Sequence, residues 1–120
     1  MARYLLLVQL LCLAASVHAN GVLILGDSIS AAYGIEKSSG WVALMDRQLK
    51  ERCPDFPVIN ASVSGETTAG GKARLPTLLA RHKPDLVVVE LGGNDGLRGL
   101  SPMVMASNLK QMISLSRQAE

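Results

Sequence analysis

Three short apolar runs alternate with three helical patterns in this sequence, and that order constrains the fold more than any other feature. The apolar runs have the length of buried strands and cover residues 22–25, 57–61 and 86–91. The helical patterns follow them at residues 41–51, 67–82 and 104–117, with Pro102 before the last. Strands that are separated by helices pair in parallel, because the chain must cross over before it can pair again. The order therefore predicts an α/β fold with a parallel sheet and helices on both faces.

The predicted sheet is small. Three strands are few for a parallel sheet, and no strand follows the last helical pattern. We therefore expect residues 20–120 to be the N-terminal portion of a single domain, truncated after about three strand–helix units. On this view, about two further units are missing.

Residues 1–19 have the pattern of a secretory signal peptide. Arg3 supplies the positive charge, an apolar run covers residues 5–15, and Val17 and Ala19 suit a cleavage site before Asn20. The apolar run is shorter than the roughly 20 residues that a membrane-spanning helix needs, so no stable span is expected after cleavage. Cys53 is then the one remaining cysteine, which excludes an internal disulfide and favours a bacterial periplasm or secretion from a bacterium.

Charge and composition exclude one broad class of function. The formal net charge is +2 and the Lys and Arg residues form no cluster, so we expect no nucleic-acid partner. Aromatic residues make up only 3% of the chain, so the core must be built from aliphatic side chains and methionine.

Glycine and small polar residues follow each predicted strand. They occupy residues 26–30, 62–68 and 92–96. Ligands of open parallel sheets bind beyond the carboxyl ends of the strands, where these three segments converge. One such segment is an ordinary turn, but three at the same edge indicate a site.

The three segments contain the parts needed for acyl transfer. Ser28 follows the first strand at an expected strand-to-helix turn and could attack an acyl carbon. The attack creates an oxyanion, which needs hydrogen-bond donors about 3 Å away. Gly65 can offer a backbone amide without a Cβ in the way, and the side-chain amide of Asn94 is a donor at every pH. Taken singly, each of these residues is also explained by turn geometry, and Ser28 by a helix N-cap.

The same residues resemble a known family. Gly26-Asp27-Ser28-Ile29-Ser30, Ser62-Val63-Ser64-Gly65 and Gly92-Gly93-Asn94-Asp95 are similar, in order and spacing, to the first three sequence blocks of the SGNH (GDSL) hydrolases. The resemblance covers essentially all of the chain after residue 19.

The resemblance implies a fold, an activity and a set of site residues. The fold would be a three-layer α/β/α sandwich of the flavodoxin-like type. Ser28 would be the nucleophile, and the oxyanion hole would consist of the amides of Ser28 and Gly65 and the side chain of Asn94. The substrates would be acyl esters, acyl thioesters or lysophospholipids, hydrolysed through an acyl-serine intermediate without a metal or a cofactor.

The sequence departs from the family in one respect. The last family block, an Asp followed three residues later by the His that acts as general base, is absent from these 120 residues. His18 lies in the predicted leader and His82 precedes the third strand, at the wrong edge of the sheet. Asp27 and Asp95 are interpreted as carboxylates that stabilise turns. A serine without a base is a weak nucleophile, so we expect these residues to be inactive alone.

Two other enzyme classes fit less well, and one non-catalytic reading stays open. An α/β-hydrolase elbow requires glycine where Ser30 stands, and a Walker loop requires glycine where Glu66 stands and Ser or Thr where Ala73 stands. A non-catalytic binding domain of flavodoxin-like fold, a pseudoenzyme, is the alternative, since fold alone does not establish catalysis.

Overall fold

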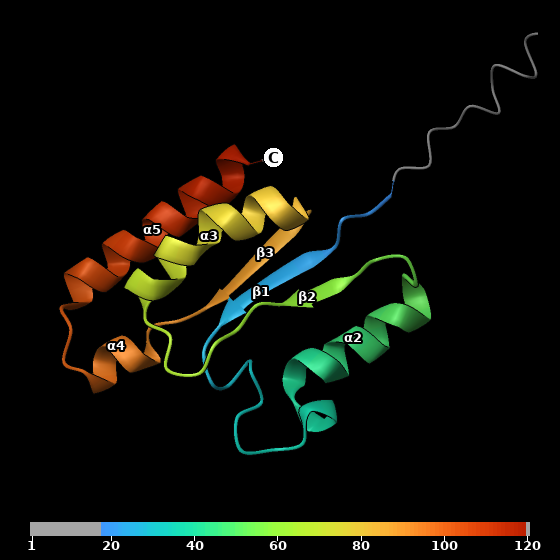
Figure 1. Cartoon of the computed structure of the whole chain (residues 1–120), viewed down its shortest axis with the longest axis horizontal. Coiled ribbons are helices and arrows are strands. Elements are labelled where there is room, and N and C mark those ends of the chain that lie inside the picture. Colours follow the sequence, from blue (N-terminus) through green and yellow to red (C-terminus); the bar gives the residue numbers. More distant parts are fainter. Residues whose placement is uncertain (1–17, 120) are drawn as a thin grey trace, which may run out of the picture.

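The computed structural model describes residues 18–119. The predicted leader therefore lies outside the described residues, apart from His18 and Ala19. The strands are β1 (Val22–Gly26), β2 (Val58–Asn60) and β3 (Leu86–Glu90) (Figure 1). The helices are η1 (Lys37–Ser39), α2 (Trp41–Arg52), α3 (Thr68–His82), α4 (Gly93–Leu97) and α5 (Pro102–Gln118).

The three strands form one parallel sheet in the order β2-β1-β3, as the alternation of elements predicts. Val22 of β1 pairs with Val58 on one side and Leu86 on the other, and Gly26 pairs with Glu90. This order is the first part of the flavodoxin-like order, in which the chain changes direction across the sheet between β1 and β3. The carboxyl ends of all three strands consequently meet at one edge.

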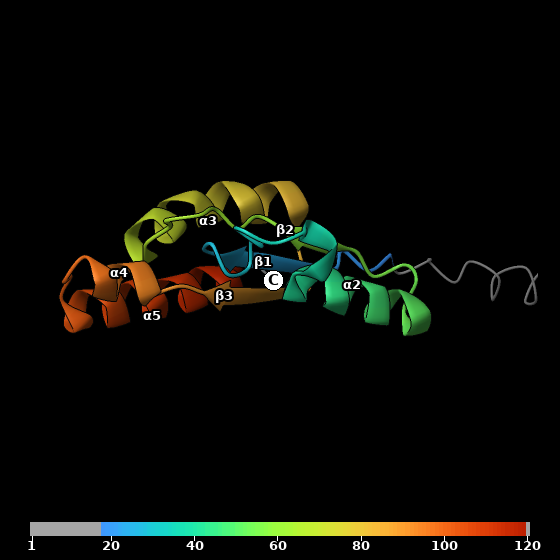
Figure 2. The same ribbon diagram turned by 90° about the horizontal axis from the view of Figure 1, so that it is seen from below.

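Helices cover both faces of the sheet (Figure 2). Side chains alternate along the central strand β1, so Leu23 and Leu25 face one side while Val22 and Ile24 face the other. Leu23 and Leu25 pack with side chains of α3 and α5, namely Leu75, Leu79 and Met112. Val22 and Ile24 pack against Val42 of α2. All four β1 side chains are buried, which confirms the predicted three-layer arrangement.

The first turn of α3 is regular although it contains two glycines. Thr67 caps the helix, because its side chain accepts a hydrogen bond from the Gly70 amide at 3.2 Å. The last turn ends at Lys83, which has a left-handed conformation. The helix predicted at 67–82 is thus confirmed, with its first turn defined by the cap.

Two expectations about local structure are wrong. In the helix predicted at residues 41–51, Leu44 recurs with Trp41 at helical spacing and is expected on the apolar face, but Leu44 is 47% exposed and the buried residue is Val42. The chain after Ser28 is not a helix but a series of turns over residues 28–34, and the helix α2 begins only at Trp41. The short helix α4 was not predicted, because glycines at 93 and 96 hide it in the sequence.

None of the helices within residues 18–119 is both long and apolar enough to cross a membrane.

Gly71 allows α3 to lie close to the sheet. A Cβ at this position would collide with Leu91 Cδ1 and would contact Leu25 Cδ2 at 3.5 Å and Met112 Sδ at 3.7 Å. We expect Gly71→Leu to lower the free energy of unfolding by about 2–3 kcal/mol, because the core has no room for the side chain. Urea unfolding of the whole protein measures this. Gly96→Leu is the matched control, since a Cβ there meets nothing within 4 Å; an equal loss in both variants would contradict the packing argument.

Candidate active site

The three polar segments meet where the strand order reverses between β1 and β3 (Figure 1). Ser28 lies just after β1, Gly65 lies in the loop between β2 and α3, and Asn94 lies in α4 just after β3. Parallel α/β proteins bind ligands at this position in the sheet. The topology therefore brings the three predicted residues to one edge.

The turn that carries Ser28 is held by hydrogen bonds to Asp27. The Asp27 side chain is buried, and its Oδ1 accepts from the Ile29 amide at 3.0 Å. The Asp27 carbonyl accepts from the Ala31 amide at 2.9 Å, and the Ser28 carbonyl accepts from the Tyr33 amide at 3.0 Å. The prediction that Asp27 stabilises this turn is confirmed, and Ser28 itself is left half-exposed at the top of the turn.

The loop that carries Gly65 is joined to the end of β1. The Val63 amide donates to the Gly26 carbonyl at 3.0 Å, and the Gly26 amide donates to Ser62 Oγ at 3.1 Å. Gly65 has a φ of +81°, a conformation that residues with a Cβ rarely adopt. The loop therefore runs beside the Ser28 turn, and its shape requires glycine at position 65.

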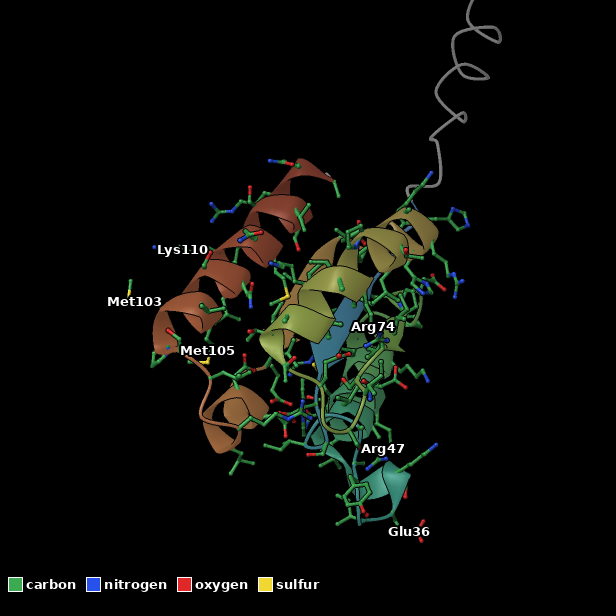
Figure 3. All side chains as sticks on the ribbon, turned by 60° about the vertical axis from the view of Figure 1, so that its left-hand side comes forward. Glu36, Arg47, Arg74, Met103, Met105 and Lys110 are labelled. Atoms are coloured by element: carbon green, nitrogen blue, oxygen red, sulfur yellow. The ribbon has the colours of Figure 1, made fainter. Side chains whose placement is uncertain are left out.

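An ion pair braces the same loop from α3. Arg74 extends from α3 (Figure 3). Its Nη1 lies 2.6 Å from Glu66 Oε2, and its Nη2 donates to the Ala61 carbonyl at 2.9 Å. The Glu66 side chain is only 10% exposed, so this pair is shielded from water more than a surface pair is. Arg74 thus holds both ends of the segment from Ala61 to Glu66.

The Asn94 side chain connects the other two segments. Its Nδ2 donates to the Glu66 carbonyl at 2.9 Å and lies 3.4 Å from Asp27 Oδ2. Glu66 is the neighbour of Gly65, and Asp27 is the neighbour of Ser28. The side-chain amide of Asn94 therefore lies between the two segments that carry the other predicted residues.

Several donors at this edge make no hydrogen bond within the described part of the chain. They are the amide and hydroxyl of Ser28 and the amide of Gly65. Backbone amides in a folded protein are usually paired with protein or with water. Unpaired amides beside a serine hydroxyl are the arrangement that an oxyanion hole requires.

Asp95 has a different role from the predicted one. Its side chain is 2% exposed and accepts from the Thr68 amide at 2.9 Å and the Thr68 hydroxyl at 2.6 Å. Asn108 of α5 also donates to the Thr68 hydroxyl, at 3.0 Å. The interpretation as a turn-stabilising carboxylate is wrong, because Asp95 instead joins α4 to the first turn of α3, and through Thr68 to α5.

Glu90, at the end of β3, is a residue that the site prediction missed. Its Oε1 accepts from the Ser30 hydroxyl at 2.6 Å. A carboxylate inside a strand signals a buried partner, but the partner is 60 residues away in the sequence and no local pattern identifies it.

No histidine of residues 18–119 lies at this edge. His82 ends α3 just before β3, and His18 precedes β1, so both lie at the amino edge of the sheet. The same residues contain no group of three or more His, Cys, Asp or Glu side chains that could hold a metal ion.

The family described as GDSL-like Lipase/Acylhydrolase matches residues 24–120. The chain belongs to this family. The match covers all three polar segments and confirms the resemblance to the SGNH (GDSL) hydrolases.

Curated esterases and a thioesterase are similar to the chain in sequence. Esterase TesA of Pseudomonas aeruginosa is 53% identical over 108 residues, which cover 90% of this chain and 54% of that protein. Arylesterase of Vibrio mimicus is 50% identical over 120 residues, which cover 99% of this chain and 60% of that protein. Thioesterase 1/protease 1/lysophospholipase L1 of Escherichia coli K12 is 47% identical over 95 residues, which cover 79% of this chain and 44% of that protein. The chain spans about half the length of these relatives.

Solved structures of esterases have the same fold. The crystal structure of TesA matches with a TM-score of 0.80 and 55% identity, over 82% of this chain and 55% of that chain. The psychrotrophic esterase EstA from Pseudoalteromonas, inhibited by monoethylphosphonate, matches with a TM-score of 0.77 and 45% identity, over 83% and 55%. The sheet and helices described above are thus those of the SGNH hydrolase fold.

Proposed function

We propose that this chain supplies the nucleophile and the oxyanion hole of a serine esterase or thioesterase. Ser28 is the nucleophile, and the donors are the amides of Ser28 and Gly65 and the side chain of Asn94. The observation that carries the proposal is the position of Asn94 Nδ2, which donates to the carbonyl beside Gly65 and lies 3.4 Å from the carboxylate beside Ser28. One side chain thus ties together the two segments that an acyl group must contact at the same time.

The reaction would proceed in two steps at this edge. Ser28 Oγ gives its proton to a general base and attacks the acyl carbon, which forms a tetrahedral intermediate with the negative charge on the acyl oxygen. This intermediate then expels the leaving group, which takes up the proton, and the acyl-serine intermediate remains. Water then hydrolyses the intermediate. The unpaired amides of Ser28 and Gly65 need no rearrangement to receive the oxyanion, and a preorganised donor of this kind contributes about 10²–10³-fold in kcat.

The proton of the Ser28 hydroxyl needs an acceptor. Asp27 is adjacent in sequence, but its two carboxylate oxygens face the Ile29 amide and the Asn94 side chain. Because both histidines of the described part lie at the amino edge, we propose that the general base comes from outside residues 18–119. Residues 20–120 would then be the N-terminal portion of a single SGNH hydrolase domain.

The substrate class follows from the chemistry and from the relatives. The relatives are named as an esterase, an arylesterase and a protein that is at once thioesterase, protease and lysophospholipase. We propose that this protein hydrolyses acyl esters and acyl thioesters, and that lysophospholipids are further substrates. The signal-peptide pattern of residues 1–19 supports export, and we propose a bacterial periplasmic or secreted location.

Covalent labelling tests the proposed nucleophile. We expect a fluorophosphonate to modify Ser28 of the whole protein at a stoichiometry near one, because phosphonates mimic the tetrahedral intermediate of acyl transfer. EstA, inhibited by monoethylphosphonate, is a precedent in a similar protein. Peptide mapping by mass spectrometry locates the label. Residues 20–120 alone should react far more slowly, since they lack the general base.

The same experiment separates an enzyme from a binding domain. No label on the folded whole protein would favour the non-catalytic alternative. A label on a different serine would instead contradict Ser28 as the nucleophile. Rapid labelling of residues 20–120 alone would instead show that the described residues already contain a sufficient base.

A further inference from the structure

The turn that carries Ser28 is connected to Glu90 on both sides. Gly26, two residues before Ser28, pairs with Glu90 in the sheet. Ser30, two residues after Ser28, donates its hydroxyl to Glu90 Oε1 at 2.6 Å. Both ends of the segment from Gly26 to Ser30 therefore contact Glu90 of β3, and Ser28 lies in the middle of this segment.

The Ser30 hydroxyl both donates and accepts a hydrogen bond. It is 2% exposed, donates to Glu90 and accepts from Trp41 Nε1 at 3.1 Å. The Ser30 carbonyl accepts from Asn60 Nδ2 at 2.8 Å. A distance of 2.6 Å is typical of a hydroxyl bound to a carboxylate, which is roughly twice as strong as a bond between neutral groups. Glu90 thus makes the shortest of the three side-chain contacts that hold Ser30.

Gly26 lets the turn close tightly. A Cβ at Gly26 would lie 2.5 Å from Ser30 Oγ and 2.7 Å from Ser30 Cβ. Ser30 therefore packs directly on the backbone of β1, and its hydroxyl reaches β3 beneath the turn. A shift of the Ser30 side chain would move the backbone that presents Ser28.

We propose that Glu90 is a positioning residue for ester hydrolysis, acting through Ser30 to hold the turn that presents Ser28 to the substrate. The inference rests on the proposed role of Ser28 as the nucleophile. Glu90 need not touch the reacting atoms: it fixes the backbone on which the nucleophile and its amide are carried. A nucleophile displaced by about 1 Å loses on the order of 10²-fold in rate.

The first test is the kinetics of the whole protein with p-nitrophenyl butyrate. We expect Glu90→Ala to lower kcat by about 10- to 100-fold while KM changes by less than about threefold, because substrate binding is intact and the attack is misaligned. Glu90→Gln should lower kcat less than Glu90→Ala does, since the side-chain carbonyl of glutamine can still accept a hydrogen bond from Ser30. Rates are expressed per folded molecule, with the folded fraction taken from thermal unfolding.

A double-mutant comparison tests whether Glu90 acts through Ser30. If it does, the variant that carries both Ser30→Ala and Glu90→Ala should have a kcat no lower than that of Ser30→Ala alone, because the single substitution already removes the contact. Asp85→Asn is the matched control at the opposite end of the same strands, where Asp85 Oδ2 accepts from the amides of Asn20 and Gly21 at 2.7 and 2.8 Å. It should reduce stability and leave kcat per folded molecule unchanged.

The outcomes separate this inference from the proposed function. If Ser28→Ala abolishes turnover but Glu90→Ala and Glu90→Gln do not lower kcat, the positioning role is wrong and the nucleophile stands. The positioning role is also wrong if the kcat losses of Ser30→Ala and Glu90→Ala multiply in the double variant. It is equally wrong if Asp85→Asn lowers kcat as much as Glu90→Ala does. If Ser28→Ala retains turnover, both proposals fail. Should Glu90→Ala not fold, Glu90→Gln and Ser30→Ala provide the same comparison.

Discussion

Ser28→Ala should lower kcat for p-nitrophenyl esters by at least about 10⁴-fold in the whole protein, which is the scale observed when a serine nucleophile is removed. The substitution removes only Ser28 Oγ, which makes no hydrogen bond within the described residues. The turn around it is held by backbone groups and by Asp27 and Ser30, so the fold should be unaffected. Initial rates and circular dichroism of the same samples measure the two expectations.

Ser39→Ala is the control for this substitution. Ser39 lies in η1, is exposed, and its side chain makes no hydrogen bond in the described part of the chain. It should retain the activity of the unchanged protein. If Ser28→Ala retains more than about a tenth of the original kcat, the hydroxyl of Ser28 is not the nucleophile and the proposed function is wrong.

Asp95→Ala should lower the free energy of unfolding by about 3 kcal/mol. Asp95 accepts two hydrogen bonds from Thr68, and Thr68 is fully buried. Each buried donor that loses its partner costs about 1–3 kcal/mol. The carboxylate also lies at the first turn of α3, where a negative charge is favourable. Urea unfolding of the whole protein measures the loss.

Two further variants sharpen this prediction. Asp95→Asn keeps one acceptor oxygen and should cost less than Asp95→Ala. Asp55→Ala removes an exposed carboxylate without a hydrogen bond in the described residues, so it should change the free energy of unfolding by less than about 0.5 kcal/mol. Equal effects of Asp95→Ala and Asp55→Ala would mean that the buried contacts to Thr68 do not stabilise the fold.

The order of elements could be predicted because apolar runs and helical patterns are local properties of the sequence. The strands at Val22–Gly26 and Leu86–Glu90 and the helix at Thr68–His82 lie within one or two residues of their predicted ranges. The chain after Ser28 and the helix α4 were less predictable. After Ser28, the tertiary contacts of Asp27 and Ser30 outweigh any helical tendency of the chain. In α4, the glycine-rich sequence is typical of a turn, but the segment forms a helix.

The candidate site could be predicted in composition but not in its supporting contacts. Ser28, Gly65 and Asn94 each follow a strand, and a parallel sheet brings the ends of its strands together whatever the details. The position of Asn94 Nδ2 between the Gly65 and Ser28 segments depends on side-chain geometry, which the spacing of residues does not encode.

The sequence alone determined the parallel α/β class, the edge at which polar residues gather and the three residues proposed for catalysis, because these depend on periodicity and on the order of elements. The tertiary structure decided what holds those residues in place. Glu90 meets Ser30 across 60 residues, and Asp95 meets Thr68 across 27. Such bonds form only after the strands have paired and the helices have packed. A carboxylate in the sequence indicates that a partner is needed, and only the folded chain shows which residue it is.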